Sequence, residues 1–204
     1  ADQELSDEDR RAVVETARRY GRVYQTGTQR LSMANFVYCI EMAKSGRLGK
    51  VHKARLSWNR NYGAYRATTP DIDPKTVDWK TFLGNAPDRP FDAFRFRSWR
   101  WFWDYSGGIL TDLMTHWIDM VNWMLDLDHP TEATTMGHHF MAKGAWETPD
   151  TIQTLLSYPE HDLQLHFEGT FVNARCGAMC ELMGTEATLY FDRGRYELHP
   201  ERGK

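Results

Sequence analysis

The sequence has 204 residues, a formal net charge of −3, and eight Trp, nine Tyr and ten Phe residues. This length allows one large domain or one domain with part of another, and the slightly acidic balance argues against a nucleic-acid partner, which needs a basic surface. No apolar run approaches the length of a membrane span, and the acidic start does not resemble a signal peptide, so we expect no membrane partner.

The chain opens with a predicted helix and a predicted short strand. Helical periodicity predicts a helix over residues 7–20, capped by Ser6 or Asp7. Residues 22–26 then predict a strand that Gly27 ends. So short a strand cannot form a sheet by itself. It either joins a sheet whose other strands are missing from this sequence, or it adds an edge to a later sheet.

The next part of the chain predicts a helix, a strand and a long loop. Ser32 caps a helix over residues 33–45, which Gly46 closes. Residues 50–60 alternate apolar and polar side chains, as a half-buried strand does. Prolines punctuate residues 62–103, which predict little regular structure, and a loop this long inside a compact domain is usually functional.

A glycine pair, Gly107 and Gly108, launches an apolar helix that runs to about Leu125. Asp112 and His116 stand four residues apart in it, so 3.6 residues per turn bring them to nearly the same face. Spacing alone favours a pair that satisfies itself or nearby backbone in the core. The alternative is an acid/base pair that lines a pocket, because a carboxylate raises the basicity of a neighbouring imidazole.

The rest of the chain is predicted to be rich in strands. They cover residues 132–140, 151–158, 163–171, 178–183 and 187–191, with a last strand near Tyr196 and turns at Gly184-Thr185 and Arg193-Gly194. Helices first and strands later predict an α+β fold, in which helices pack on one face of a sheet of antiparallel neighbours.

Neither the cysteines nor the histidines predict a metal site. Thiols buried in a reducing compartment are more consistent with the spacing than a disulfide, and this applies to Cys39, Cys176 and Cys180. Four histidines receive no role because they are not paired at metal-ligand spacing with carboxylates or thiols, namely His138, His139, His161 and His166.

A series of short motifs gives the chain a family resemblance. The motifs are the runs 23–30 and 45–51, Asp78-Trp79 with Phe82-Leu83-Gly84, Trp99-Arg100 with 102–105, Gly107-Gly108 with Asp112 and His116, and the run 147–151. Each motif alone is weak. Their order and spacing over nearly the whole chain resemble the Gfo/Idh/MocA family of glucose-fructose oxidoreductase and inositol dehydrogenase. This resemblance shifts the interpretation of Asp112 and His116 from a core pair to an active site.

The resemblance implies a domain organisation. Residues 1–30 look like the last helix-strand unit of a truncated Rossmann domain, and residues 31–204 look like the family's substrate-binding and oligomerisation domain, built on a large open sheet. The sequence lacks the family's glycine-rich loop and its Glu-Lys-Pro motif, whose lysine is normally catalytic. NAD or NADP is therefore expected to bind to a missing N-terminal domain, and no cofactor-binding residue is assigned. A cytoplasmic location is favoured, with an upstream export signal left open.

The family's reaction transfers a hydride between a sugar or cyclitol carbon and nicotinamide. The resemblance implies that His116 is the base, while Asp112 positions the substrate hydroxyl. Further substrate contacts are expected from Gln29, Arg30, Asn59, Tyr62, Arg100, Trp101, Gly107 and Gly108. For Gln29 and Arg30 a solvated loop is the alternative. For Arg100 and Trp101 it is an aromatic core under a long loop.

Two other functions stay open. Some relatives use transient oxidation by a bound nicotinamide to cleave glycosides, so a hydrolase or lyase is an alternative to net oxidation. As a fragment, the chain could also be a non-catalytic binding or oligomerisation module. A homodimer or homotetramer through the sheet is the expected assembly.

Overall fold

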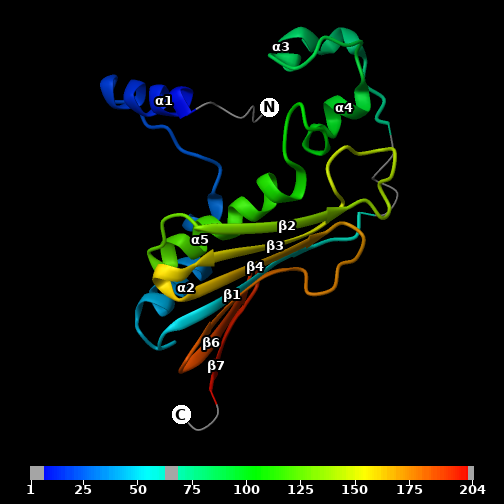
Figure 1. Cartoon of the computed structure of the whole chain (residues 1–204). Helices are drawn as coiled ribbons and strands as arrows, with labels where there is room; N and C mark the ends of the chain where they lie inside the picture. Colours follow the sequence, from blue (N-terminus) through cyan, green and yellow to red (C-terminus); the bar gives the residue numbers. More distant parts are fainter. Residues whose placement is uncertain (1–6, 63–68, 202–204) are drawn as a thin grey trace.

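The computed structural model describes residues 7–62 and 69–201, and in them the chain forms one seven-stranded sheet (Figure 1). Its order is β2-β3-β4-β1-β5-β6-β7, and β1 pairs parallel with β4 while the other neighbours pair antiparallel. The strands are β1 (Val51–Asn59), β2 (Glu132–His138), β3 (Thr151–Tyr158), β4 (Leu163–Thr170), β5 (Ala178–Gly184), β6 (Ala187–Asp192) and β7 (Tyr196–Pro200). The predicted mostly antiparallel α+β fold is confirmed.

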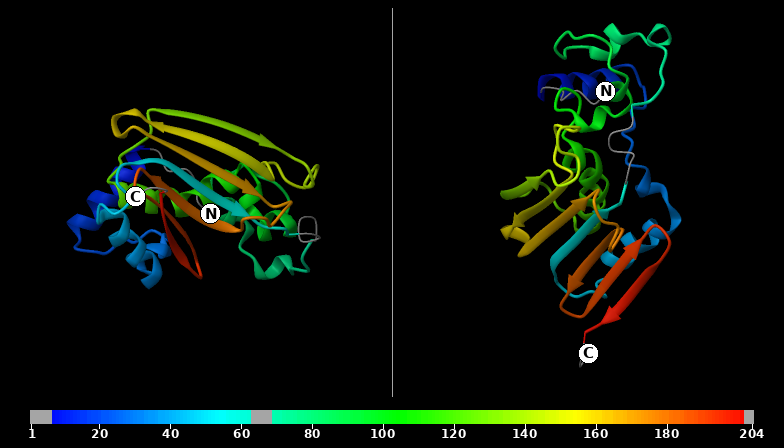
Figure 2. Two further views of the ribbon diagram at one scale, coloured as in Figure 1. Left: turned by 90° about the horizontal axis from the view of Figure 1, so that it is seen from below. Right: turned by 90° about the vertical axis from the view of Figure 1, so that its right-hand side faces the viewer.

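One face of the sheet is covered by two apolar helices, α2 (Ala34–Lys44) and α5 (Thr115–Leu125), as Figures 1 and 2 show. The indole of Trp117 is fully buried and donates from Nε1 to the carbonyl of Ser57 on β1 at 2.9 Å. Phe36 on α2 packs edge-on against it. On β4 the alternation of buried and less buried side chains follows the pleat, as a strand with one covered face requires.

The central strand β1 departs from the predicted half-buried alternation. Its last four residues are all buried, including Ser57 and Asn59 on the face opposite the helices. The reason is the loop before β5, whose Gly177 carbonyl accepts from both the Ser57 hydroxyl and the Asn59 backbone amide. The sequence of β1 shows no sign of this covering loop.

The predicted long loop contains short helices where regular structure was not expected. They are η3 (Pro74–Thr76), α3 (Trp79–Leu83), α4 (Ala93–Arg97) and η4 (Trp99–Trp101). Three of them begin with an aspartate that accepts a backbone N–H two or three residues on, namely Asp73, Asp78 and Asp92. Asx capping thus makes single helical turns from a segment whose prolines obscure any longer period.

Residues 22–26 form no strand, so that prediction is wrong. Helix α1 (Asp7–Arg19) stands apart from the sheet (Figure 1). The extended chain that follows it pairs with none of the described strands. Val23 is 95% exposed, which leaves this segment without the burial that stabilises a strand. The predicted cap Ser6 lies outside the described residues.

Two further boundaries are corrected, and one short turn is added. Ser32 ends a 3-10 turn, η1 (Gln29–Ser32), and Met33 occupies the N-cap position of α2. Strand β2 ends at His138 rather than at residue 140, because the Phe140 amide turns away to donate to Asp150. One more 3-10 turn, η6 (Pro159–His161), joins β3 to β4.

The three cysteines are free, but only Cys39 and Cys180 are buried, so the prediction of buried thiols fails at Cys176. That residue has a φ of +67° in the loop before β5, which turns its thiol outward. Among the described residues, none of the helices combines the length and apolarity that a membrane span needs.

Candidate active site

The helix of the glycine pair begins with a π-helical turn, η5 (Ile109–Met114), before it continues as α5. Gly108 precedes it with a φ of +65°, and a Cβ there would lie 2.5 Å from Thr148 Oγ1, so both backbone and packing require glycine. The sequence predicted a continuous α-helix. The wider turn changes the direction of Asp112, and such turns are frequent at functional sites.

Asp112 lies on this turn with its carboxylate half-buried. Arg100 donates to Asp112 Oδ2 from Nε at 3.0 Å, and the same guanidinium lies over the Trp99 ring, 4.3 Å from the ring centroid. The structure therefore brings Arg100 and Asp112 together, as two members of the predicted site. A carboxylate held in this way has a fixed orientation for a further hydrogen-bond donor.

His116 is one turn further on, against β1. Its ring stacks on Trp58 with centroids 5.9 Å apart and 27° between the planes, and its Nδ1 is buried without a hydrogen-bond partner among the described residues. Burial lowers the pKa of His116, the positive charge of Arg30 lowers it further, and the charge of Asp112 opposes both. The imidazole is thus kept in its neutral, proton-accepting form near neutral pH.

Arg30 is 1% exposed and lies between two indoles, 3.7 Å from the centroid of Trp117 and 4.6 Å from that of Trp58. All three guanidinium nitrogens are buried, and within the described chain no acceptor reaches them. Burial, with the charge of Arg193 next in size, lowers the pKa of Arg30 to about 9, so the group is still protonated at neutral pH. The predicted solvated loop is excluded for Arg30, while Gln29 beside it is exposed.

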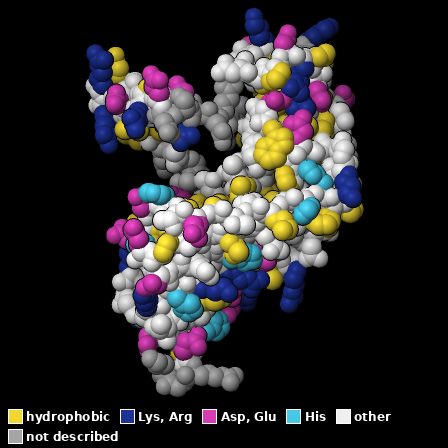
Figure 3. Space-filling view, viewed as in Figure 1, with side chains coloured by type: hydrophobic (Ala, Val, Ile, Leu, Met, Phe, Trp, Pro, Cys, Tyr) yellow, Lys and Arg dark blue, Asp and Glu magenta, His cyan; other side chains and the backbone are white. Residues whose placement is uncertain are grey.

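A hollow of about 1530 Å³ opens beside Asp112. Gly107 and Thr115 share its wall with Asp112, while α1 and residues 21–24 line its opposite side, as the gap in Figure 3 shows. Trp103 also lines it and is 60% exposed. The hollow therefore presents both an exposed aromatic face and a fixed carboxylate that can accept hydrogen bonds.

The other two predicted aromatic contacts, Trp101 and Tyr62, do not line the hollow, and Tyr62 is 37% exposed. Trp101 is buried and stacks on Trp146, with ring centroids 4.4 Å apart. Tyr62 stacks on Phe171, which also receives the edge of Trp101. The alternative of an aromatic core under the loop is therefore observed for Trp101, and the structure does not place this indole in the hollow.

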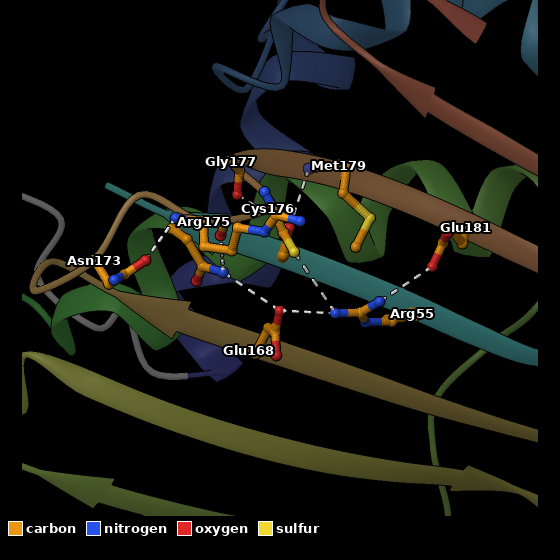
Figure 4. Close-up of polar contacts among 10 residues, drawn as sticks. Arg55, Glu168, Asn173, Arg175, Cys176, Gly177, Met179 and Glu181 are labelled. Atoms are coloured by element: carbon orange, nitrogen blue, oxygen red, sulfur yellow. Dashed lines mark hydrogen bonds and ion pairs between the residues drawn. The ribbon is translucent and has the colours of Figure 1, made fainter. Parts of the chain in front are cut away.

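Asn59 is not brought together with His116. Successive side chains of a strand point to opposite faces, so Asn59 turns away from the helix-covered face that Trp58 shares with His116. Its Nδ2 donates to Glu168 and to the Arg175 carbonyl on the open face of the sheet, where Arg55 also joins Glu168 to Glu181 (Figure 4). Asn59 thus lies at the end of β1, as predicted, but on the open face and away from His116.

Sequence reasoning missed Trp103, Trp58 and Arg193 as residues of the site. Trp103 belongs to the aromatic run that was noticed, but no periodicity in a loop shows which indole is exposed. Trp58 and Asn59 are neighbours on β1 and point to opposite faces of the sheet, so only the orientation of the strand shows which of them lies beside His116. Arg193, exposed in the β6–β7 turn, lies over the Trp58 ring at 5.5 Å. No local signal announces a contact between residues so far apart in the chain.

The site fits the reactive end of a nicotinamide cofactor rather than the whole molecule. The hollow beside Asp112 has the room, and a neutral imidazole suits proton removal. The sequence contains no glycine-rich loop of the kind that holds a pyrophosphate. Among the described residues, no group of three or more His, Cys, Asp or Glu side chains is placed so that it could hold a metal ion.

An open seven-stranded sheet covered on one face by α2 and α5 defines an α+β domain. Residues 36–190 match the family model described as GFO/IDH/MocA C-terminal domain. The chain belongs to the GFO/IDH/MocA family. Comparison with curated proteins finds no match.

Solved structures share this fold at low sequence identity. Levoglucosan dehydrogenase, in complex with NADH and levoglucosan, is 16% identical with a TM-score of 0.67, covering 97% of this chain and 48% of that chain. An inositol dehydrogenase homolog from Azotobacter vinelandii, complexed with NADH and myo-inositol, is 16% identical with a TM-score of 0.62, over 97% and 47%. The WlbA dehydrogenase from Bordetella pertussis, with NADH and UDP-GlcNAcA, is 14% identical with a TM-score of 0.65, over 97% and 53%. The chain thus spans about half the length of these proteins.

Proposed function

We propose that this chain is the substrate-binding part of a nicotinamide-dependent dehydrogenase that acts on a hydroxyl-bearing carbon of a sugar or cyclitol. The observation that carries the proposal is the half-buried His116, whose pKa burial lowers, one turn from the fixed carboxylate of Asp112, which lines a hollow of about 1530 Å³. The similar structures that hold NADH with levoglucosan or myo-inositol support the same class of substrate and NAD(P) as cofactor.

In this proposal the residues of the chain handle the proton and the position of the substrate. His116 accepts the hydroxyl proton, and its lowered pKa keeps it ready to do so at neutral pH. Asp112, held by Arg100, accepts a hydrogen bond from a neighbouring hydroxyl. Trp103 offers an apolar face to the ring. The nicotinamide supplies hydride transfer when it is bound.

The domain boundaries are part of the proposal. Residues 1–30 belong to a Rossmann domain and residues 31–204 form the substrate-binding and oligomerisation domain. Helix α1 supports this division, since it lines the hollow through Val13, Val14 and Ala17 and packs on none of the described strands. Exposed apolar side chains on the open side of the sheet, Met136 and Leu155, support assembly into a homodimer or homotetramer there.

A substrate panel tests the proposal. The full-length protein is incubated with NAD or NADP and a set of sugars, cyclitols and aryl glycosides, while NAD(P)H absorbance and aglycone release are followed together. We expect net NAD(P)H formation with at least one sugar or cyclitol. Aglycone release without NAD(P)H would instead support glycoside cleavage. The isolated 204-residue chain is expected to show no nicotinamide-dependent turnover, and turnover in it would contradict the domain boundary.

A further inference from the structure

The helix-covered end of β1 holds a positive charge that no residue of the described chain neutralises. Arg30 is 1% exposed, stacked on Trp117 and Trp58, and its three nitrogens have no hydrogen-bond acceptor among the described residues. An uncompensated charge in the interior is costly, and buried groups left unpaired in a native structure call for an explanation. The two indoles favour the cation through their faces but offer no acceptor to its edges.

The imidazole of His116 shares the Trp58 ring with this guanidinium. His116 stacks on Trp58 at 5.9 Å and Arg30 lies over the same ring at 4.6 Å. The Trp58 ring carries no charge, and Arg30 is sealed from solvent, so water screens the field of Arg30 only weakly. His116 Nδ1 has no acceptor beside it within the described chain that would stabilise an imidazolium.

We propose that Arg30 is a positioning residue that acts through His116. Its unpaired positive charge keeps the His116 imidazole neutral, so that this side chain accepts a proton instead of forming an ion pair with Asp112. This inference rests on the proposed function for its meaning, since it deepens the role of His116. It assigns Arg30 a contribution that does not require contact with substrate. Arg100 then has a complementary part, because it engages Asp112, the carboxylate that would favour a charged imidazole.

The charged groups that act on His116 come from four elements. Arg30 of η1 and Arg193 of the β6–β7 turn disfavour the imidazolium, whereas Asp112 of η5 and Asp119 of α5 favour it. Burial acts in the direction of the two arginines and is the largest influence. The β1 side contributes only the Trp58 ring. The inference thus depends on the sum of opposed charges, of which Arg30 is the one sealed from solvent.

Titration of His116 by NMR tests the inference on the 204-residue chain itself. Arg30→Met keeps the aliphatic stem and removes the charge, so the pKa of His116 is expected to rise, while Arg30→Lys keeps the charge and should retain most of the wild-type value. Arg55→Met is the matched control. It removes an arginine on the open face of the sheet and should leave His116 unchanged. An unshifted His116 in Arg30→Met would overturn the proposal.

A second variant covers the case in which Arg30→Met does not fold. Arg193 is exposed and can be replaced at small structural cost, and Arg193→Met should raise the pKa of His116 by less than Arg30→Met does. No shift in that variant contradicts the electrostatic account. In the full-length protein, Arg30→Met should shift the acid limb of the kcat/KM pH profile to higher pH. Arg30→Lys should return that limb to its wild-type position.

The two proposals fail in different ways. If His116 shifts as expected but His116→Ala keeps normal turnover, the charge relation holds and the proposed function fails. If His116→Ala abolishes turnover but Arg30→Met leaves the His116 titration unchanged, the function holds and the role of Arg30 is lost.

Discussion

Two charged side chains are fully buried in the described part of the chain, Asp150 and Arg30, and they are treated in opposite ways. The Asp150 carboxylate accepts from the backbone amides of Phe140, Met141 and Ala142 and from the Thr151 hydroxyl, at 2.7–3.1 Å. The Arg30 guanidinium has two aromatic faces and no acceptor within the same described part. The two side chains are buried to nearly the same extent, so loss of solvent contact does not explain why, among the described residues, one has hydrogen-bond partners and the other has none.

The difference shows which buried charge serves the fold. Asp150 ties down the loop that carries Glu147, and Glu147 in turn accepts from Arg95 and from the Trp103 backbone amide. That chain of contacts ends at a residue that lines the hollow. Arg30 and the imidazole of His116 instead lie against the same Trp58 ring. A charge that is satisfied supports structure, whereas one left unpaired beside a titratable group points to chemistry.

The largest effect on activity is expected from His116→Ala, which tests whether the residues around the unpaired Arg30 charge include the catalytic base. Loss of a general base should lower kcat of the full-length protein by about 10²- to 10⁴-fold, with little change in sugar affinity. His166 is the matched control, because it is a partly buried histidine on the open face of the sheet, and its pKa is likewise lowered by burial. Similar losses in both variants would return His116 to a structural role.

Asp150→Ala should have the largest effect on stability. It leaves three backbone amides without their acceptor, so we expect the free energy of unfolding to fall by about 3 kcal/mol. Urea denaturation measures this, with Asp162→Asn as the control, since Asp162 is an exposed partner of Lys50 and asparagine tolerates its left-handed backbone, so the change should have no measurable effect. Equal stability of the two variants would show that the loop does not depend on Asp150.

Gly108→Ala tests how tightly Thr148, next to the Asp150 loop, packs on the turn that carries Asp112. Gly108 and Gly144 both have positive φ, +65° and +75°, so alanine strains the backbone at each. Only at Gly108 does the new Cβ meet a neighbour, Thr148 Oγ1 at 2.5 Å, while Gly144 faces open space. Gly108→Ala should therefore destabilise by about 1–3 kcal/mol and by more than Gly144→Ala, as measured by thermal unfolding.

Much of this fold was predictable, because strands and apolar helices repeat their patterns over many residues. The strands from β3 to β7 and the helix of Asp112 and His116 were predicted close to their observed ends. The strand at residues 22–26 was not, since a short β-rich run has no partner to pair with. The π-helical turn at η5 changed the direction of Asp112 without any sequence signal.

The site was predictable in part, for the same reason. Local spacing put Asp112 and His116 on one helix face but favoured a core pair, and it was the family resemblance that named them as a site. Arg30 could be named but not placed, because its burial depends on Trp58 and Trp117 from two other elements. Trp101 and Trp103 are two residues apart, and only the packing of the loop decides which one lies in the core. Long-range contacts therefore account for most of what the sequence did not show.

Acid unfolding sharpens the comparison through pH. Burial pushes the pKa of Asp150 upward, but the hydrogen bonds from the amides of Ala142, Met141 and Phe140 outweigh it, so the pKa lies below the usual 3.8. The stability that Asp150 contributes is therefore complete above its unfolded pKa and is lost as pH falls through its lower folded value. Asp150→Asn should flatten the dependence of unfolding free energy on pH below about 5. An unchanged slope would contradict the role assigned to these amides.

The smallest effect on stability is expected from Arg30→Met, and its contrast with Asp150→Ala is the most direct test of the comparison. Removing an unpaired buried charge relieves a desolvation cost, and an apolar side chain of similar length in place of a buried ion is often neutral or stabilising by about 1–4 kcal/mol. Against this, the variant loses the contacts of the cation with Trp117 and Trp58, worth about 0.5–2 kcal/mol.

Because these two contributions oppose each other, the free energy of unfolding of Arg30→Met should stay within about 1 kcal/mol of the wild type. Urea denaturation at neutral pH measures it alongside Asp150→Ala. A loss as large as that of Asp150→Ala would mean that Arg30 has an acceptor in solution, and the contrast between the two buried charges would disappear. A small change in the free energy of unfolding, together with an altered titration of His116, would show that Arg30 acts on His116 while Asp150 stabilises the fold.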